Sequence, residues 1–163
     1  MPQTYSNILL HVVFSTKQRI PFADHSQRQR LYQYMAAIIK DRYGFPIIIN
    51  GCDEHVHMMV NLRPTIAISD AMRVVKACSS KWFHETFPRV PFGWQDGFSV
   101  FSVSESNRQD VIDYIRDQEE HHKKMDFRRE LVLLLKKNAV QLEGRDFPWN
   151  EGESQRGAAP SGA

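Results

Sequence analysis

The sequence predicts an α+β domain of the ferredoxin-like, split βαβ type, in which a four-stranded antiparallel sheet has two helices on one face. Segments with the apolar pattern of strands and segments with the pattern of amphipathic helices follow one another in the order strand, helix, strand, strand, helix, strand. A third helical segment, which carries Tyr114, follows the fourth strand. We expect this helix to lie near the other face of the sheet.

Composition is that of an ordinary globular protein. The chain has 163 residues, of which 42% are hydrophobic and 25% charged, so we expect a single domain over residues 1–150. Residues 151–163 contain no core-forming side chain and are expected to be a disordered tail. Apolar runs are shorter than the ~20 residues of a membrane span, and the N-terminus lacks a signal-peptide pattern. We therefore expect a cytoplasmic protein without membrane contact, in which Cys52 and Cys78 are buried thiols, with a disulfide between them as the alternative.

The N-terminal third predicts a strand, a basic loop and a helix. The strand covers Tyr5 to Phe14, which is rich in β-branched and aliphatic residues. The loop covers Ser15 to Ala23. The helix then begins at a cap residue, either Asp24 or Ser26, and its apolar residues keep a helical period up to the glycine at position 44.

Two strands follow, Phe45 to Cys52 and Glu54 to Leu62. The dipeptide Asn50-Gly51 is typical of tight hairpin turns, so we place the turn near it. The later elements follow from the same kinds of signal. They are a helix capped by Ser69 and ending near Phe87, a loop from Pro88 to Gly97, a strand from Phe98 to Val103, a helix from Asn107 to Lys124, and a helix from Phe127 to about Asn138 capped by Asp126.

The stretch His55-Val56-His57 lies in the third of these strands. Successive strand residues point to opposite faces, so the two imidazoles share one face and can bind one metal ion together. A third ligand is needed. Gln118 is the best candidate, because it lies four residues after Tyr114 in the third helix, a spacing that puts the amide and the phenol on one helix face.

These neutral donors favour Mg²⁺ or Mn²⁺, because they leave the ion its full charge for binding a phosphodiester. Structural zinc sites usually contain paired cysteines, and the sequence has no C-x₂-C motif. Cys52 and Asp53 form an alternative ligand set, which a turn would hold less firmly. Tyr114 is then a candidate nucleophile that attacks phosphorus, and the ion would stabilise the developing charge.

Basic side chains are spread along the chain rather than collected in one run, and the net charge is only +2. Lys17, Arg19, Arg73 and Lys76 are candidate contacts for DNA phosphates, chosen from their charge and position. The pair His121-His122 ends the third helix. These histidines could assist the chemistry or bind metal, but a solvated position near the negative end of the helix dipole is the better expectation.

Four segments resemble the small single-tyrosine HUH transposases of bacterial insertion sequences, which are related to the REP-associated tyrosine transposases. HUH denotes histidine, hydrophobe, histidine. The segments are HVVFSTKQR (His11 to Arg19), DEHVHMMV (Asp53 to Val60), GWQDGFSVFSVS (Gly93 to Ser104) and YIRDQEEHH (Tyr114 to His122). They occur in the family's order, and the resemblance runs from about Tyr5 to Asn138.

This resemblance implies a transposase that cleaves and rejoins single-stranded DNA with Mg²⁺ or Mn²⁺. His55, His57 and Gln118 would be the metal ligands. Tyr114 would be the nucleophile and would become linked to the 5′ phosphate, leaving a free 3′ hydroxyl. The family also implies binding of DNA hairpins at the element ends and a homodimer, in which the tyrosine helix of one subunit can complete the histidine site of the other. Glu54 departs from the Asp usual before the first histidine, which is a conservative change.

Other classes of function remain open from the residues alone. A domesticated DNA-binding protein or a replication-type nickase of the same fold would share the site without mobilising an element. A cupin-like metalloenzyme also has His-x-His on a strand, but it would want a glutamate well placed after His57, and fewer helices. A non-catalytic RNA-binding module would want aromatic residues where the sheet face carries histidines.

Overall fold

Six elements form the ferredoxin-like core and confirm the predicted fold class. In the computed structural model, which describes residues 3–141, they are β1 (Leu9–Ser15), α1 (His25–Arg42), β2 (Gly44–Gly51), β3 (His55–Leu62), α2 (Ile68–Thr86) and β4 (Ser99–Val103). The strands form one antiparallel sheet in the order β2-β3-β1-β4. The strand that carries the histidine pair, β3, is therefore central.

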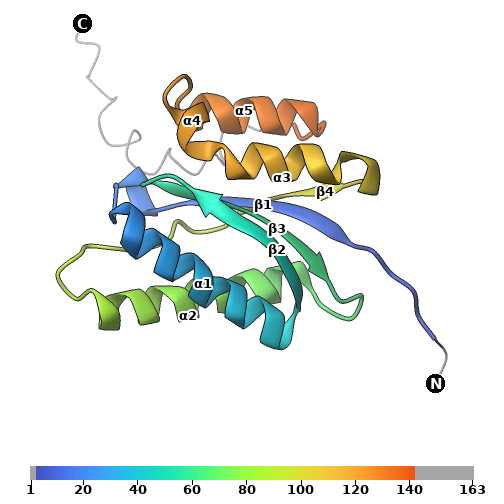
Figure 1. Cartoon of the computed structure of the whole chain (residues 1–163), viewed down its shortest axis with the longest axis horizontal. Helices are drawn as coiled ribbons and strands as arrows, with labels where there is room; N and C mark the ends of the chain where they lie inside the picture. Colours follow the sequence, from blue (N-terminus) through green and yellow to red (C-terminus); the bar gives the residue numbers. More distant parts are fainter. Residues whose placement is uncertain (1–2, 142–163) are drawn as a thin grey trace, which may run out of the picture.

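The C-terminal helices cover the second face of this sheet (Figure 1). They are α3 (Arg108–Arg116), α4 (Gln118–His122) and α5 (Phe127–Lys137), and single helical turns, η1 (Lys17–Arg19) and η2 (Glu105–Asn107), occur in the connections. Helices α1 and α2 lie together on the opposite face. The tail predicted for residues 151–163, and the end of the domain predicted at residue 150, lie outside the described residues.

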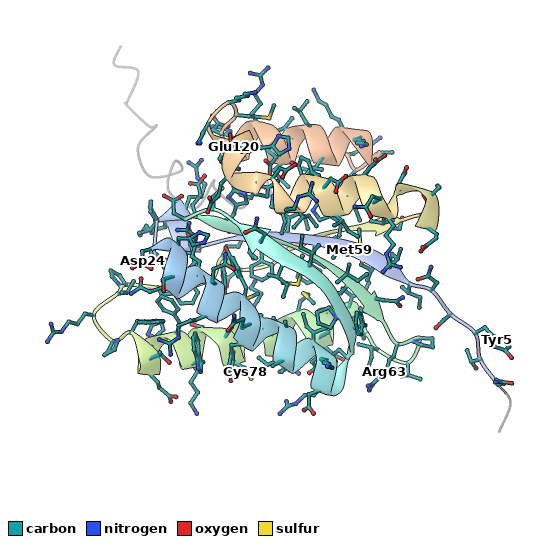
Figure 2. All side chains as sticks on the ribbon, viewed as in Figure 1. Tyr5, Asp24, Met59, Arg63, Cys78 and Glu120 are labelled. Atoms are coloured by element: carbon teal, nitrogen blue, oxygen red, sulfur yellow. The ribbon has the colours of Figure 1, made fainter. Side chains whose placement is uncertain are left out.

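Apolar side chains fill the space on both sides of the sheet (Figure 2). The larger cluster lies between the sheet and the first two helices, and includes Val12 and Phe14 of β1, Val56 and Met58 of β3, and Leu31 of α1. The smaller cluster lies on the other side and consists of Val13, Phe101, Phe127, Leu131 and Leu135, with Leu134 packed against it. The sheet is thus buried on both faces.

The first strand and helix differ little from expectation. Strand β1 begins at Leu9 rather than Tyr5, because its pairing with β3 starts at the contact of Leu9 with Asn61, near the end of β3. Asp24 is the cap of α1, as predicted. Its side chain accepts a hydrogen bond from the backbone N–H of Gln27, and the Gln27 side chain accepts one from the backbone of Asp24, which makes a complete capping box.

The turn predicted at Asn50-Gly51 is wrong by two residues. Both residues belong to β2, where they pair with His57 and Val56, and the turn consists of residues 52–54. The Asn50 side chain donates hydrogen bonds to the carbonyls of Ile115 (3.1 Å) and Arg116 (2.9 Å), so this residue serves tertiary structure rather than a turn. Glycine is needed at position 51 because a Cβ there would collide with the carbonyl of His55.

Two helix boundaries also differ from expectation. Helix α2 starts at Ile68 after Ala67, not at a Ser69 cap, because Ile66 and Ile68 pack against the core and draw the first turn inward. The helix predicted from Asn107 to Lys124 is interrupted at Asp117, whose backbone leaves the helical region (φ −92°, ψ 20°). The interruption coincides with the carbonyls that Asn50 binds. The Asp126 cap of α5 is confirmed.

We predict that Leu31→Ala lowers the free energy of unfolding by about 2–5 kcal/mol, because Leu31 is fully buried between α1 and the sheet and its removal leaves a cavity. Leu133→Ala on α5 is the matched control. Its side chain is 47% exposed, so the change should be within about 0.5 kcal/mol. Urea denaturation followed by circular dichroism measures both, and equal losses would contradict the proposed core.

Candidate active site

The two histidines of β3 share one face, as predicted, and this face points away from the main core. His55 and His57 lie on the face that α3, α4 and α5 cover, while the intervening Val56 packs in the larger apolar cluster. Both imidazoles are completely buried. Their position is set by the alternation of β3, because any strand residue two positions from a buried one shares its face.

A carboxylate that sequence reasoning missed lies at the point where these imidazoles converge. Glu130 of α5 places Oε1 2.6 Å from His57 Nε2 and 3.7 Å from His55 Nε2. These three side chains could hold a metal ion, since their ligand atoms lie within 4.8 Å of one another. One signal was available in the sequence: Glu130 falls on the inner stripe of α5 with Phe127, Leu131 and Leu135.

Gln118 and Tyr114 reach the same place from the other side. The side-chain carbonyl oxygen of Gln118 lies 3.2 Å from His55 Nε2, and its amide nitrogen donates to the Tyr114 carbonyl at 3.3 Å. The Tyr114 hydroxyl interacts with the side chains of Gln118 and Glu130, and its ring lies 5.7 Å from that of His57. The helix break does not separate the predicted pair, because the first residue of α4 remains stacked below Tyr114.

A third histidine of the site, His11 on β1, was also missed as a site residue. Its Nε2 lies 2.9 Å from His57 Nδ1, and both rings are buried. A single proton is shared across this contact, and if it resides on His57 Nδ1, the Nε2 lone pair of His57 is free for a metal ion. His11 is thus placed to set the tautomer and ring orientation of His57.

The expectation of a solvated pair at His121-His122 is wrong for His122. Its side chain is only 14% exposed, its ring lies 4.3 Å from that of His55, and its Nε2 is 3.4 Å from Glu130 Oε2. The helix break turns α4 back toward the sheet, and this brings the residue inward. The ring of His121 lies 5.0 Å from that of Tyr114.

Burial dominates the electrostatics of the site. It lowers the pKa of His11 to about 3 and that of His55 well below its usual value, and the proximity of His57 lowers both further. Burial alone would raise the pKa of Glu130, but hydrogen bonds from His122 and His57 outweigh it and hold this pKa far below its usual range. The cluster therefore combines an ionised carboxylate with neutral imidazoles at His11 and His55.

The phenol of Tyr114 is a weaker acid than an ordinary tyrosine in the metal-free protein. Burial, and then the negative charge of Glu130, raise the pKa of its phenol above the ordinary value. The phenol therefore carries its proton at neutral pH and needs a neighbouring cation or base for attack.

The alternative ligand set of Cys52 and Asp53 does not come together. Cys52 lies near His55 and His122, but Asp53 is exposed and belongs to neither group of candidate metal ligands found among the described residues. Burial raises the pKa of the Cys52 thiol to about 12, and its sulfur contacts the carbonyl of Gln118 at 3.5 Å. Both cysteines are free thiols, but the expectation that both are buried is wrong for Cys78, which is half-buried.

An open cavity of about 560 Å³ leads from the solvent to Tyr114. It lies between β4, α3 and α5, and its wall includes His11, Tyr114, Glu130, Lys124 and Lys137. Tyr114 is therefore accessible to a substrate, and basic side chains flank the approach.

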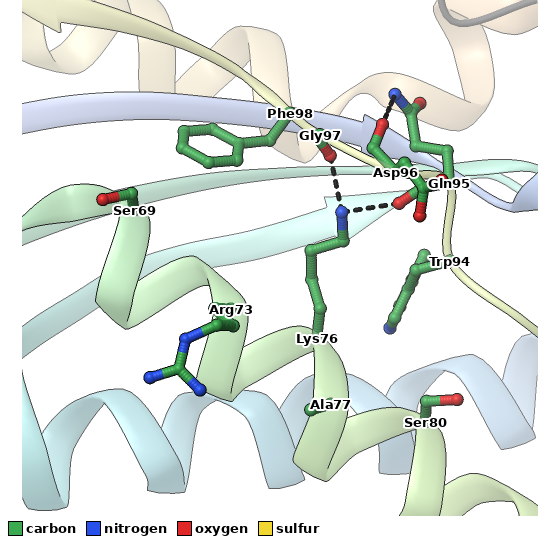
Figure 3. Close-up of a pocket in the computed structure, with 10 residues that line it drawn as sticks. All are labelled: Ser69, Arg73, Lys76, Ala77, Ser80, Trp94, Gln95, Asp96, Gly97 and Phe98. Atoms are coloured by element: carbon green, nitrogen blue, oxygen red, sulfur yellow. Dashed lines mark hydrogen bonds between the residues drawn. The ribbon is translucent and has the colours of Figure 1, made fainter.

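The candidate DNA contacts fall in two other places. Arg73 and Lys76 of α2 line a pocket on the opposite side of the sheet from Tyr114 (Figure 3). The Lys76 ammonium donates to the carbonyls of Gln95 (2.6 Å) and Gly97 (2.5 Å), so it holds the loop before β4. Lys17 lines a separate pocket beside η1, and Arg19 lies in the same helical turn. The structure does not gather these four side chains into one surface.

Comparison with known proteins gives the family of the chain. Residues 4–118 match the model of a family described as "Transposase IS200 like". The chain belongs to this IS200-like transposase family. It is 25% identical over 129 residues to the transposases of insertion sequence IS200 from Salmonella typhimurium and Salmonella typhi, covering 76% of this chain and 84% of each of theirs. The protein is thus a transposase, as the resemblance predicted.

Solved structures show the same fold. The crystal structure of a candidate transposase from Deinococcus radiodurans R1 matches with a TM-score of 0.58 and 21% identity, covering 72% of this chain and 96% of that one. A REP-associated tyrosine transposase bound to a REP hairpin matches with a TM-score of 0.56 and 18% identity, covering 90% and 93%. Among the described residues of this transposase, no helix has the length and apolar character needed to cross a membrane.

We predict that the metal-free transposase loses stability as the pH falls from about 6.5 to 5. Both His11 and His55 have a lowered pKa in the folded state, so the unfolded chain takes up protons first and protonation favours unfolding. The free energy of unfolding should fall by up to about 1.4 kcal/mol per pH unit for each of the two histidines.

Urea denaturation in EDTA at several pH values measures this slope. His11→Gln should reduce it, whereas the control His25→Gln should not, because the His25 side chain is 65% exposed. An unchanged slope in His11→Gln would show that the ring of His11 is not held neutral by the fold.

Proposed function

We propose that this transposase cleaves and rejoins single-stranded DNA, with Tyr114 as the nucleophile and a divalent metal ion as cofactor. The observation that supports this most is the convergence of Tyr114 with the buried side chains of His55, His57 and Gln118, because Tyr114 also lines a cavity open to solvent. A nucleophile beside a group of nitrogen and oxygen donors is what phosphodiester transfer needs.

The residues present fit Mg²⁺ or Mn²⁺. The Nε2 atoms of His55 and His57 converge on one buried place, and the amide oxygen of Gln118 lies 3.2 Å from His55 Nε2. Oxygen donors such as the Gln118 amide suit these hard cations. When bound, such an ion polarises the phosphodiester and offsets the charge that develops on its oxygens.

Tyr114 carries the covalent step. Its phenolic oxygen forms a bond to phosphorus while the bond from phosphorus to the 3′ oxygen breaks. The phenol gives up its proton, and the departing 3′ oxygen takes up a proton to become a free hydroxyl, so the 5′ phosphate remains on Tyr114. Rejoining reverses these steps, when a 3′ hydroxyl attacks the phosphotyrosine. Gln118 supports Tyr114 by bonding its backbone carbonyl and by interacting with its hydroxyl.

The substrate strand would enter along the cavity between β4, α3 and α5. Lys124 and Lys137 in its wall can pair with phosphates on either side of the scissile bond. The REP-associated transposase of the same fold binds a REP hairpin, which supports DNA hairpins at the element ends as the natural partner. Lys17, Arg19 and Arg73 would contact the more distant duplex part, and Lys76 would act by holding the loop before β4.

A homodimer remains part of the proposal, as the family implies. In the structure, however, Tyr114 meets the histidines of its own chain. A second subunit is therefore not required to complete the constellation, and the dimer would serve to hold two DNA ends together.

We predict that Tyr114→Phe abolishes cleavage and the covalent protein–DNA adduct but leaves DNA binding within about twofold of wild type, because it removes only the reacting oxygen. Tyr5→Phe is the matched control, since Tyr5 is 83% exposed and remote from the site. Incubation with labelled single-stranded flanks of the gene, followed by denaturing gels, measures the adduct. Adduct formation by Tyr114→Phe at the wild-type rate would assign the chemistry to another residue.

We also predict cleavage of single-stranded DNA but not of the matched duplex. Tyr114 lies inside a cavity, so the scissile phosphate must bend inward, which a flexible strand allows and a stiff duplex resists. Binding should weaken steeply between 50 and 200 mM salt, by about 10- to 1,000-fold for a few phosphate contacts. Gel shifts and cleavage on hairpin, linear and duplex oligonucleotides test this, and equal cleavage of duplex would contradict it.

A further inference from the structure

The match to the family model ends at residue 118. Residues beyond this point also contribute to the candidate active site. Helix α5 lies beyond the matched region and places Glu130 between the two histidines of β3. We infer that Glu130 is a further ligand of the divalent ion, so that α5 contributes a side chain to the metal site. This inference rests on the proposed function, since it concerns the same ion.

The distances place one carboxylate oxygen at the centre of the cluster. Glu130 Oε1 lies 2.6 Å from His57 Nε2 and 3.7 Å from His55 Nε2. The second oxygen lies 3.4 Å from His122 Nε2. An ion bound by the two Nε2 atoms would therefore meet Glu130 Oε1 without movement of α5 to another position on the sheet.

A carboxylate is an unexpected residue at this position in α5. Glu130 is only 3% exposed, and the neighbouring inner positions hold Phe127, Leu131 and Leu135, which pack in the smaller apolar cluster. A buried ionised carboxylate is costly unless it is paired with a cation or coordinates a metal. Ring nitrogens of His55, His57 and His122 lie 2.6–3.7 Å from the Glu130 carboxylate. A divalent cation held among these groups would pair with the carboxylate.

Glu130 would change the net charge and the donor atoms of the metal site. Two imidazoles and an amide leave a divalent ion with its full charge, whereas a carboxylate reduces the net charge by one and adds a hard oxygen donor that suits Mg²⁺ and Mn²⁺. Because Glu130 also interacts with the Tyr114 hydroxyl, the ion, α5 and the nucleophile would be held together. Binding of the ion would then stabilise the packing of α5 on the sheet.

The first experiment is titration of the full chain with Mn²⁺ in a calorimeter, without DNA. We expect Glu130→Gln to weaken Mn²⁺ binding at least about tenfold, since the amide keeps the shape and loses the charge. Glu120→Gln is the matched control. Glu120 lies on α4, is 74% exposed and pairs only with Lys123 at 3.0 Å among the described residues, so binding should not change. Circular dichroism establishes that each variant is folded.

The second experiment needs no variant of Glu130. Hydrogen exchange of the wild-type chain should show slower exchange of the amides of α5 when Mn²⁺ is added, because the ion ties this helix to β3. Unchanged exchange in α5 at saturating Mn²⁺ would overturn the inference, as would wild-type Mn²⁺ affinity in Glu130→Gln.

His55→Ala separates this inference from the proposed function. If His55→Ala abolishes Mn²⁺ binding while Glu130→Gln keeps it, Glu130 is not a ligand and the proposed function stands. If His55→Ala binds Mn²⁺ as tightly as the wild type, the metal site itself is misplaced and both fail. Loss in both variants supports both.

Discussion

The position of β3 between two buried layers is the constraint on which the site depends. One face of this strand packs Val56, Met58 and Val60 against α1 and α2 in the main core, and the other face carries His55 and His57. A slip of one residue in its pairing would exchange the faces and bury the imidazoles among apolar side chains. Pairing with β1 on one side and β2 on the other excludes such a slip.

A second constraint holds the nucleophile above that strand. Asn50 of β2 binds the carbonyls at the end of α3, and Gly51 allows the two strands to approach closely beside His55. The end of α3 is therefore attached to the edge strand β2, beside the central strand β3 that presents the histidines. The resulting break at Asp117 turns α4 back over the sheet, which brings both Gln118 and His122 into the site. A straight helix would have carried His122 into solvent.

The buried polar cluster explains why a transposase of this size has helices beyond the ferredoxin-like core. His11, His57 and Glu130 are linked in a row, from β1 through β3 to α5. Such a chain of buried groups is stable only while water is excluded and every member keeps a partner. The apolar contacts of Phe127 and Leu131 supply that exclusion on one side, and the open cavity beside Tyr114 leaves access on the other. One side of α5 thus excludes water from the buried cluster, and the other side leaves Tyr114 open to the solvent.

The sequence by itself determined the fold class, the order of the strands and helices, and the shared face of His55 and His57, because these follow from local periodicity and the alternation of strand residues. The spacing of Tyr114 and Gln118 was also readable, although the helix break between them was not. Tertiary structure alone decided that Asn50 binds carbonyls at the end of α3 rather than forming a turn, that His122 packs inward against His55, and that Glu130 and His11 join the site. These positions depend on contacts between residues 46 to 73 apart in the chain, and no local pattern specifies which distant element a polar side chain will meet.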